Sequence, residues 1–382
     1  KLTVTGVPDA GLTAVYGGKT NGDANSKNNS VLVQGTDQYG SNPAVHSTIP
    51  NVYGGYTTAD YRTETIDNKI VDKAGVAEGN TATISGGNVT SVYGGVAKGD
   101  KGKARSNKAV VGGGTVTNVY GGAVDKSDAA ATLNTAQVSG GTVTGTIAGA
   151  SAVYDTAAGA THTLSNRNRV ILGGKNATRA LPMDVALASI YGTDYRDPSV
   201  ASPEQTFNGG SDQIKGNELT VKTTGVSAKK VRNFDAYTFV VGKDFNDGDT
   251  VLTLTEAGFG DVTSATSATH VRVDWRNVKA HMGEPLVASG EGIHGHNDKI
   301  TLMKLGTGVP ATDALRFAHY EDTDTAEAEG LYEMKVKPAN TMSSPAGSSA
   351  ATDLDTSAVM LELNRFRFDE VTYDGTVVPS DH

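Results

Sequence analysis

Residues 80–95 read NTATISGGNVTSVYGG, and residues 107–122 read NKAVVGGGTVTNVYGG. A third copy, NTAQVSGGTVTGTIAG, occupies residues 134–149. The three segments begin 27 residues apart and match at an asparagine, at three aliphatic positions and at two glycine-rich corners. Self-similarity at a short, fixed period is the signature of a repeat protein in which each unit packs on the next.

Partial copies extend the repeat in both directions. Val-Tyr-Gly-Gly also occurs at residues 15–18 and 52–55, Asn29 stands four residues before Val33, and Ile171-Leu172-Gly173-Gly174 is a later copy. The consensus is N-x-x-x-[IV]-x-G-G-x-V-x-x-[VT]-[YI]-[GA]-G, followed by a polar insert of variable length. Steps longer than 27 residues predict insert loops in the early units, over Thr36–Pro50 and Tyr56–Thr65.

The repeat predicts short strands, because β-branched runs end at glycine pairs that permit sharp corners. A unit this short cannot bury its own apolar face, so like residues must stack over like residues about 4.8 Å apart. We therefore expect an all-β fold, a right-handed parallel β-helix (solenoid) with a β-rich C-terminal continuation. The valines would form an internal stack, and Asn29, Asn80, Asn107 and Asn134 a ladder of side-chain amides.

Two other β architectures fit the sequence less well. Propeller blades are about 40–45 residues long, which exceeds the 27-residue step. The strands of a sandwich would not carry identical residues at identical positions. Glycine is also too frequent for a helical protein, at 47 of 382 residues.

Composition and charge exclude several classes of function. The chain has no cysteine, hence no disulfide framework and no thiolate metal site. Its net charge of −9 disfavours nucleic acid as a partner. It has no run of 18 apolar residues and no signal peptide, and we expect either a cytoplasmic protein or a processed piece of a larger one.

Breaks in the repeat predict four regions. These are a glycine-rich repeat β-helix at 1–193, a long loop at 194–215, further coils at 216–280, and a β-rich segment with exposed loops at 281–382. Predicted strands in the last two regions are Glu218–Val221, Thr238–Val241, Thr250–Leu254, Val271–Trp275, Ile300–Leu305, Gly330–Val336 and Ala358–Phe368.

The repeats resemble those in passenger domains of type V secreted proteins, the autotransporters of Gram-negative-type bacteria. A second stretch supports the resemblance: Asn217-Glu218-Leu219-Thr220-Val221, then Asn233-Phe234-Asp235-Ala236-Tyr237-Thr238-Phe239, then Gly248-Asp249-Thr250-Val251-Leu252. The resemblance covers about residues 1–275. It implies a secreted adhesin at the cell surface, anchored to the outer membrane only through a C-terminal barrel. This sequence lacks the family's secretion signal and that barrel.

Candidate catalytic groups are sparse. Carboxylates in the repeats do not recur in frame, which predicts no acidic cluster of the kind that polysaccharide-degrading β-helices use. No Gly-Asp-Ser-Gly-Gly or G-x-S-x-G motif of a serine enzyme occurs. An ion pair with a carboxylate of an adjacent coil is possible for Arg167 and Arg169. A metal ion could be held by His294, His296 and Asp298, together with His281. Polar surface turns explain both groups as well. We therefore expect no catalytic residues, no metal, no cofactor and no enzyme activity.

Tyr16, Tyr53, Tyr93 and Tyr120 occupy one repeated position. They form either an outward aromatic stripe that binds ligands or an inward core stack, since one of two adjacent residues in a strand faces inward. The sequence as a whole predicts a surface-displayed adhesin that binds host or bacterial surface proteins or glycans at many points, through its insert loops. Alternatives are a polysaccharide-degrading β-helix enzyme and a structural surface protein that drives aggregation by self-association.

Overall fold

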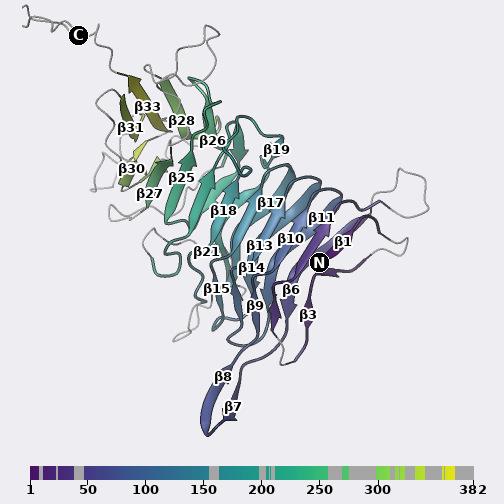
Figure 1. Cartoon of the computed structure of the whole chain (residues 1–382). Helices are drawn as coiled ribbons and strands as arrows, with labels where there is room; N and C mark the ends of the chain where they lie inside the picture. Colours follow the sequence, from purple (N-terminus) through teal and green to yellow (C-terminus); the bar gives the residue numbers. More distant parts are fainter. Residues whose placement is uncertain are drawn as a thin grey trace, which may run out of the picture.

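The computed structural model describes residues 1–7, 12–22, 25–37, 47–154, 163–197, 204–205, 207, 211–256, 269–274, 298–309, 315–317, 319–322, 332–339, 355–356 and 358–365. The strands in this part of the chain wind into coils that stack along one axis (Figure 1). Three sheets run along the stack, and strands of successive coils pair in parallel within each sheet. The described structure is a parallel β-solenoid, as the repeat predicts.

Sheet 1 takes one short strand from each coil. In order of pairing these are β1 (Leu2–Val4), β5 (Ser30–Val33), β10 (Thr81–Ile84), β13 (Lys108–Val111), β16 (Thr135–Val138), β18 (Arg169–Leu172), β22 (Glu218–Val221), β25 (Ala236–Val240), β27 (His270–Asp274) and β30 (His319–Asp322).

Sheet 2 holds the longest strands. In order of pairing, its strands are β2 (Val15–Tyr16), β6 (Thr48–Thr57), β11 (Asn88–Ala97), β14 (Thr115–Val124), β17 (Gly141–Val153), β20 (Ser189–Arg196) and the antiparallel β21 (Glu204–Gln205). Three further short strands pair with members of this series: β3 (Lys19–Thr20) with β6, β19 (Met183–Asp184) with β17, and β24 (Lys230–Arg232) with β20. Sheet 3 is formed by β4 (Ser26–Lys27), β9 (Val76–Glu78), β12 (Lys103–Arg105) and β15 (Ala130–Thr132).

The strand register places like side chains over one another. One buried column on sheet 2 consists of Val15, Val52, Val92, Val119, Ile147, Ile190 and Val231. A facing column on sheet 1 includes Val33, Ile84, Val111, Val138, Leu172 and Val221. The inward placement of the repeated valines is confirmed, and burial of aliphatic side chains between coils stabilises the stack.

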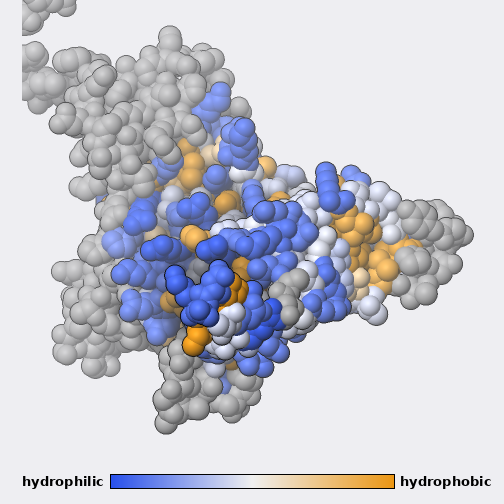
Figure 2. All heavy atoms as spheres, turned by 60° about the horizontal axis from the view of Figure 1, so that its bottom comes forward, coloured by the Kyte–Doolittle hydropathy of each residue, from blue (hydrophilic) through white to orange (hydrophobic). Residues whose placement is uncertain are grey.

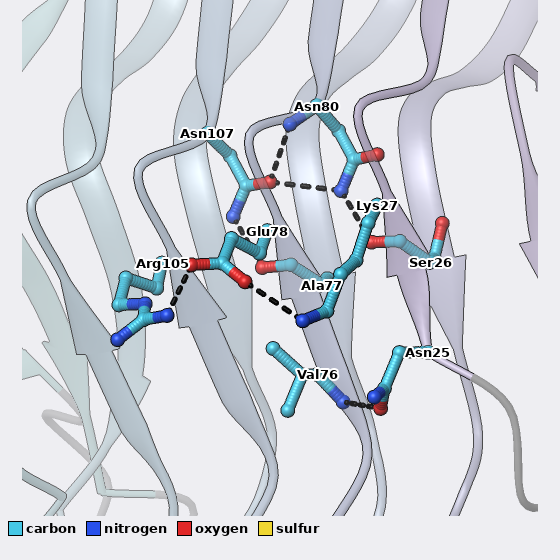
Figure 3. Close-up of polar contacts among 9 residues, drawn as sticks. All are labelled: Asn25, Ser26, Lys27, Val76, Ala77, Glu78, Asn80, Arg105 and Asn107. Carbon is cyan, nitrogen blue, oxygen red and sulfur yellow. Dashed lines mark hydrogen bonds and ion pairs between the residues drawn. The ribbon is translucent and has the colours of Figure 1, made fainter.

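The predicted asparagine ladder is present and is longer than predicted. The Nδ2 groups of Asn29, Asn80, Asn107 and Asn134 each donate to Oδ1 of the next asparagine, at 3.0–3.1 Å, and Asn168 is the next member. The backbone N–H of Asn168 then donates to Oδ1 of Asn217 at 2.8 Å. Figure 3 shows Asn80 and Asn107 in this arrangement, where Asn107 Nδ2 also donates to the carbonyl of Ala77.

Each ladder asparagine follows a tight left-handed turn. The residue before it has positive φ in every described coil: Asn28, Gly79, Ser106, Leu133, Arg167 and Gly216. In the first four of these coils the turn joins sheet 3 to sheet 1, and in each coil it directs the asparagine inward. There it meets the second glycine of the Val-Tyr-Gly-Gly motif: a β-carbon on Gly55, Gly95 or Gly122 would overlap the amide of Asn80, Asn107 or Asn134, respectively. The asparagine and the glycine pair are therefore two halves of one contact.

This contact divides the interior into two hydrophobic cores. The larger core lies between sheet 1 and the first half of the long strands of sheet 2, and contains residues such as Ile84 and Val92. The smaller core lies between sheet 3 and the second half of those strands, and contains Ala77, Ala97 and Ala104. Because Gly94 and Gly95 fall between Val92 and Ala97, the long strands pass from one core to the other at the glycine pair.

The C-terminal part changes from parallel to antiparallel pairing. β23 (Val226–Ala228), β26 (Thr250–Leu254) and β28 (Asp298–Leu305) pair in parallel, and β33 (Ala358–Arg365) and β31 (Tyr332–Pro338) then add antiparallel strands. β29 (Leu315–Arg316) pairs with β32 (Asp355–Thr356). All seven strands predicted beyond residue 216 overlap described strands, which confirms the β-rich continuation.

The insert predicted as a loop over Tyr56–Thr65 has a different structure. Tyr56 and Thr57 end strand β6, and the insert forms an antiparallel hairpin of β7 (Arg62–Ile66) and β8 (Lys69–Lys73). The hairpin projects from the side of the solenoid (Figure 1). Of the other predicted insert, Thr48–Pro50 belong to β6, and residues 38–46 lie outside the described residues.

Candidate functional site

The repeated tyrosines face away from the core and stack on one another along sheet 2. Neighbouring ring centroids in the series Tyr16, Tyr53, Tyr93 and Tyr120 are 5.0–5.1 Å apart, with interplanar angles of 11–14°. The rings are half-buried, whereas the valine before each of them is buried. Desolvation by burial raises the pKa of the Tyr53, Tyr93 and Tyr120 hydroxyls above the usual value.

This stacking determines what the tyrosines can present to a ligand. Each internal ring has both faces covered by neighbouring rings, so only ring edges and hydroxyl groups point outward. Tyr56 adds edge contacts to Tyr16 and Tyr53, and the Lys19 ammonium lies 4.9 Å from the Tyr16 ring centroid. Aromatic pairs of this kind contribute about 0.5–1.5 kcal/mol each. The ladder is therefore a structural element of sheet 2 with a narrow exposed edge, rather than a platform of open ring faces.

A cluster of charged residues lies farther along the same face of sheet 2. The tyrosine column continues through Ala148 to Tyr191 and then Arg232. Asp194 is 3% exposed and pairs with Arg196 at 2.7 Å, and Glu204 pairs with Lys230 at 2.8 Å and with Arg232 at 3.4 Å. The sequence predicted no acidic cluster because Glu204 comes from β21, outside the repeat frame.

The charges around Asp194 and Glu204 indicate that these two carboxylates mainly stabilise the fold. Burial raises the pKa of Asp194 despite the adjacent Arg196. Burial also opposes ionisation of Glu204, but the hydrogen bond and charge of Lys230 lower its pKa overall. Both acids have basic partners, and Glu204 and Arg196 occupy facing positions on β21 and β20. The cluster therefore fastens β21, which lies within the predicted 194–215 loop, onto sheet 2.

Similar ion pairs connect the coils on the outside of sheet 3. Glu78 on β9 binds Lys27 of the preceding coil at 3.1 Å and Arg105 of the following coil, so one carboxylate bridges three strands (Figure 3). The Lys27 hydrogen bond, followed by that of Arg105, lowers the pKa of Glu78. On sheet 1, Arg169 meets Glu218 of the next coil at 2.8 Å, which is one of the two alternatives that the sequence left open.

The β7–β8 hairpin is the most prominent described projection. Its turn residues Asp67 and Asn68 both have positive φ, which is typical of the type I′ turns that match the twist of a hairpin. Ile66 and Ile70 are 43% and 77% exposed. Figure 2, turned so that this side of the molecule comes forward, shows a mainly hydrophilic front with a few hydrophobic atoms. The signal that could have revealed the hairpin in the sequence is Asp67-Asn68, two turn-forming residues between Ile66 and Ile70.

The histidines that the sequence analysis weighed as metal ligands, His281, His294 and His296, lie outside the described residues. Asp298 is the buried first residue of β28. Within the described ranges, no group of three or more His, Asp or Glu side chains has a metal-binding arrangement. No helix in the same ranges is long and apolar enough to cross a membrane.

The candidate functional features are therefore three: the tyrosine ladder, the charged cluster under β21 and the β7–β8 hairpin. Comparison of the chain with protein-family models, with curated proteins and with solved structures found no match.

Proposed function

We propose that this chain is a surface-displayed passenger domain of the autotransporter type, built as a right-handed parallel β-helix, and that it acts as an adhesin without enzyme activity. Its partners would be host or bacterial surface proteins or glycans, met at the cell surface, with the full-length protein anchored in the outer membrane. Right-handed winding is supported by the general rule that parallel strands of one sheet are joined by right-handed crossovers.

The observation that supports adhesion best is a projecting hairpin on a stiff scaffold. Parallel pairing, the asparagine ladder and the tyrosine ladder all run along one axis, so neighbouring coils are fixed to one another at several points. The β7–β8 hairpin extends from this stack with Ile66 and Ile70 exposed. Exposed apolar groups on a rigid support are suited to contact with another macromolecule.

Attachment of coated beads tests this proposal. Beads carrying the intact chain and beads carrying a variant with residues 62–73 replaced by a short Gly-Ser linker are compared on host cells and on bacteria. We expect at least a several-fold loss of attachment, while circular dichroism and the unfolding midpoint show that the solenoid persists. A point variant, Ile70→Ser, tests the apolar contact with the hairpin retained. Unchanged attachment of the folded hairpin-less variant would refute the role given to the hairpin.

The polysaccharide-degrading alternative has one observation in its favour, the proximity of Asp194 and Glu204. Their ion pairs with Arg196 and Lys230 argue for a structural role instead. An Asp194→Asn variant separates the two interpretations, because an enzyme would lose reducing-end release from polysaccharides whereas a structural pair would alter only unfolding.

A further inference from the structure

An open pocket lies where the β7–β8 hairpin leaves the solenoid. Its lining consists of Tyr61, Asp72, Lys73, Ala74, Lys101 and Lys103. The first four residues come from the base of the hairpin. Lys101 and Lys103 come from the next coil, at the turn before β12 and on β12 itself. The pocket therefore forms only when the hairpin packs against the following coil.

The pocket combines an oriented carboxylate with a fixed cation. The Tyr61 hydroxyl donates to Asp72 Oδ1 at 2.7 Å. The Lys101 ammonium lies 3.6 Å from the centroid of the Tyr61 ring. Lys101 has a left-handed backbone, with φ of 51°, and its N–H donates to Asp128 Oδ1 at 3.1 Å. This backbone contact anchors the turn that holds the Lys101 side chain over the ring.

Two of the three lysines have no carboxylate partner in the part of the chain that the structure describes. Lys73 pairs with Glu64 at 2.5 Å. Among the residues that the structure describes, neither Lys101 nor Lys103 lies within 4.0 Å of a carboxylate oxygen. Their neighbours on the same side of the solenoid are paired: Lys27 and Arg105 with Glu78, Lys98 with Asp125, and Lys126 with Asp100. In a chain of net charge −9, two unmatched ammonium groups at one pocket are a specific feature.

We propose that this pocket binds an acidic saccharide, a uronic or sialic acid residue. The ammonium groups of Lys101 and Lys103 would donate to the sugar carboxylate. The carboxylate of Asp72 would accept from sugar hydroxyls, and Tyr61 and Ala74 would contact the apolar part of the sugar ring. The site deepens the proposed adhesive function, on which it rests, by naming the class of partner that the hairpin region recognises.

The same contacts distinguish this ligand from two simpler ones. A neutral sugar would leave both ammonium groups without an anion. Inorganic phosphate would supply the anion, but it has no apolar surface for Tyr61 and Ala74 to contact. An acidic saccharide is the chemical class that matches the cations, the acceptor and the aromatic ring together.

Calorimetric titration of the full chain tests the proposal. The probes are trigalacturonate and sialyllactose, with lactose as the neutral match and inorganic phosphate as the simple anion. We expect binding of an acidic probe that weakens as sodium chloride rises from about 50 to 500 mM, because salt screens exposed charges. We expect Lys103→Gln to weaken binding about tenfold, the scale of one hydrogen bond to a charged group, and Lys103→Arg to retain most of it.

A charge-matched control is Lys175→Gln, which removes an exposed lysine elsewhere on the solenoid and should leave binding unchanged. The proposal is overturned if neither acidic probe binds, if lactose or phosphate binds as well as they do, or if both lysine-to-glutamine variants weaken binding equally. Loss of attachment without the hairpin, together with no saccharide binding, would reject this ligand and retain the adhesive function. If the chain binds the saccharide but removal of the hairpin does not change attachment, the ligand is retained and the adhesive role of the hairpin is rejected.

Discussion

Gly122 lies directly against the side-chain amide of Asn134, with no space between them for a β-carbon. The contact recurs between Gly55 and Asn80 and between Gly95 and Asn107, in successive coils. In each pair the asparagine follows the glycine in the chain, so the contact joins the glycine pair of one repeat to the asparagine of the next repeat. The glycine is required because the ladder amide fills the place that a side chain would take.

We predict that Gly122→Ala destabilises the solenoid by about 1–3 kcal/mol, the usual cost of an extra methyl group in a packed interior. The added carbon would push Asn134 out of line and weaken its hydrogen bonds to Asn107 and Asn168. Gly112→Ala is the matched control, since the nearest atoms to a β-carbon there are 3.9 Å away. Urea unfolding measures both variants. Equal midpoints for the two would contradict the importance of the glycine–asparagine contact.

The asparagine ladder itself should show a position effect. Asn107 is buried, accepts from the backbone N–H and the Nδ2 of Asn80, and donates to Ala77 and Asn134. Asn29 stands at the end of the ladder and is less buried. Because an unsatisfied buried polar group costs about 1–3 kcal/mol, we predict that Asn107→Ala costs at least about 3 kcal/mol and Asn29→Ala clearly less. Denaturant titration provides the comparison, and a larger cost at Asn29 would argue against the ladder.

These two contacts show what the sequence could and could not predict. The ladder was predictable because an amide can both donate to and accept from an identical group in the next coil. The direction in which the tyrosine side chains point was not predictable. Valine and tyrosine are adjacent, so either one can face inward until the strand is placed in the sheet. The repeat does not predict the hairpin, because its strands Arg62–Ile66 and Lys69–Lys73 lie in an insert that the consensus does not describe. The pocket at its base depends on Lys101, from a coil that sequence spacing alone does not bring to Tyr61.

The inner tyrosines should stabilise sheet 2 through their rings rather than their hydroxyls. Tyr93 is stacked on both faces, by Tyr53 and Tyr120. We predict that Tyr93→Ala costs about 2–4 kcal/mol, because it removes two ring contacts and leaves a gap in the column. Tyr93→Phe should cost less than about 1 kcal/mol. Bead attachment by the phenylalanine variant then tests whether the exposed edge also binds partners, since only a hydroxyl-dependent contact would weaken.

Glu78 should make the stability of the solenoid dependent on acid. Its pKa is lowered, chiefly by the hydrogen bond from Lys27 and then by that from Arg105. The ionised carboxylate therefore stabilises the fold fully above the ordinary pKa of 4.5, and this contribution is lost as the pH falls through the lowered value. We predict that Glu78→Gln lowers the unfolding midpoint at pH 7, and that the difference from the native chain shrinks toward pH 3. A difference independent of pH would show that packing, not charge, is lost. Asp125→Asn, at the exposed pair with Lys98, is the control.

The first described coil should accept a further repeat stacked on it. Leu2 pairs with Val31, Val31 with Ala82, and Ala82 with Ala109, so Lys1 occupies the same position in its coil as Lys108. A second copy of residues 108–134 joined directly before Lys1 would place an asparagine at the next ladder position and a valine over Val15. We predict a higher thermal midpoint, because Leu2 and its neighbours become buried at about 25 cal/mol per Å² of apolar surface. The matched control carries Val111→Asp and Val116→Asp within the added copy, which prevents it from packing while keeping its length. Thermal unfolding of the three proteins gives the result, and an extended chain that melts no higher than this control would contradict stacking of the added copy on β1, β2 and β4.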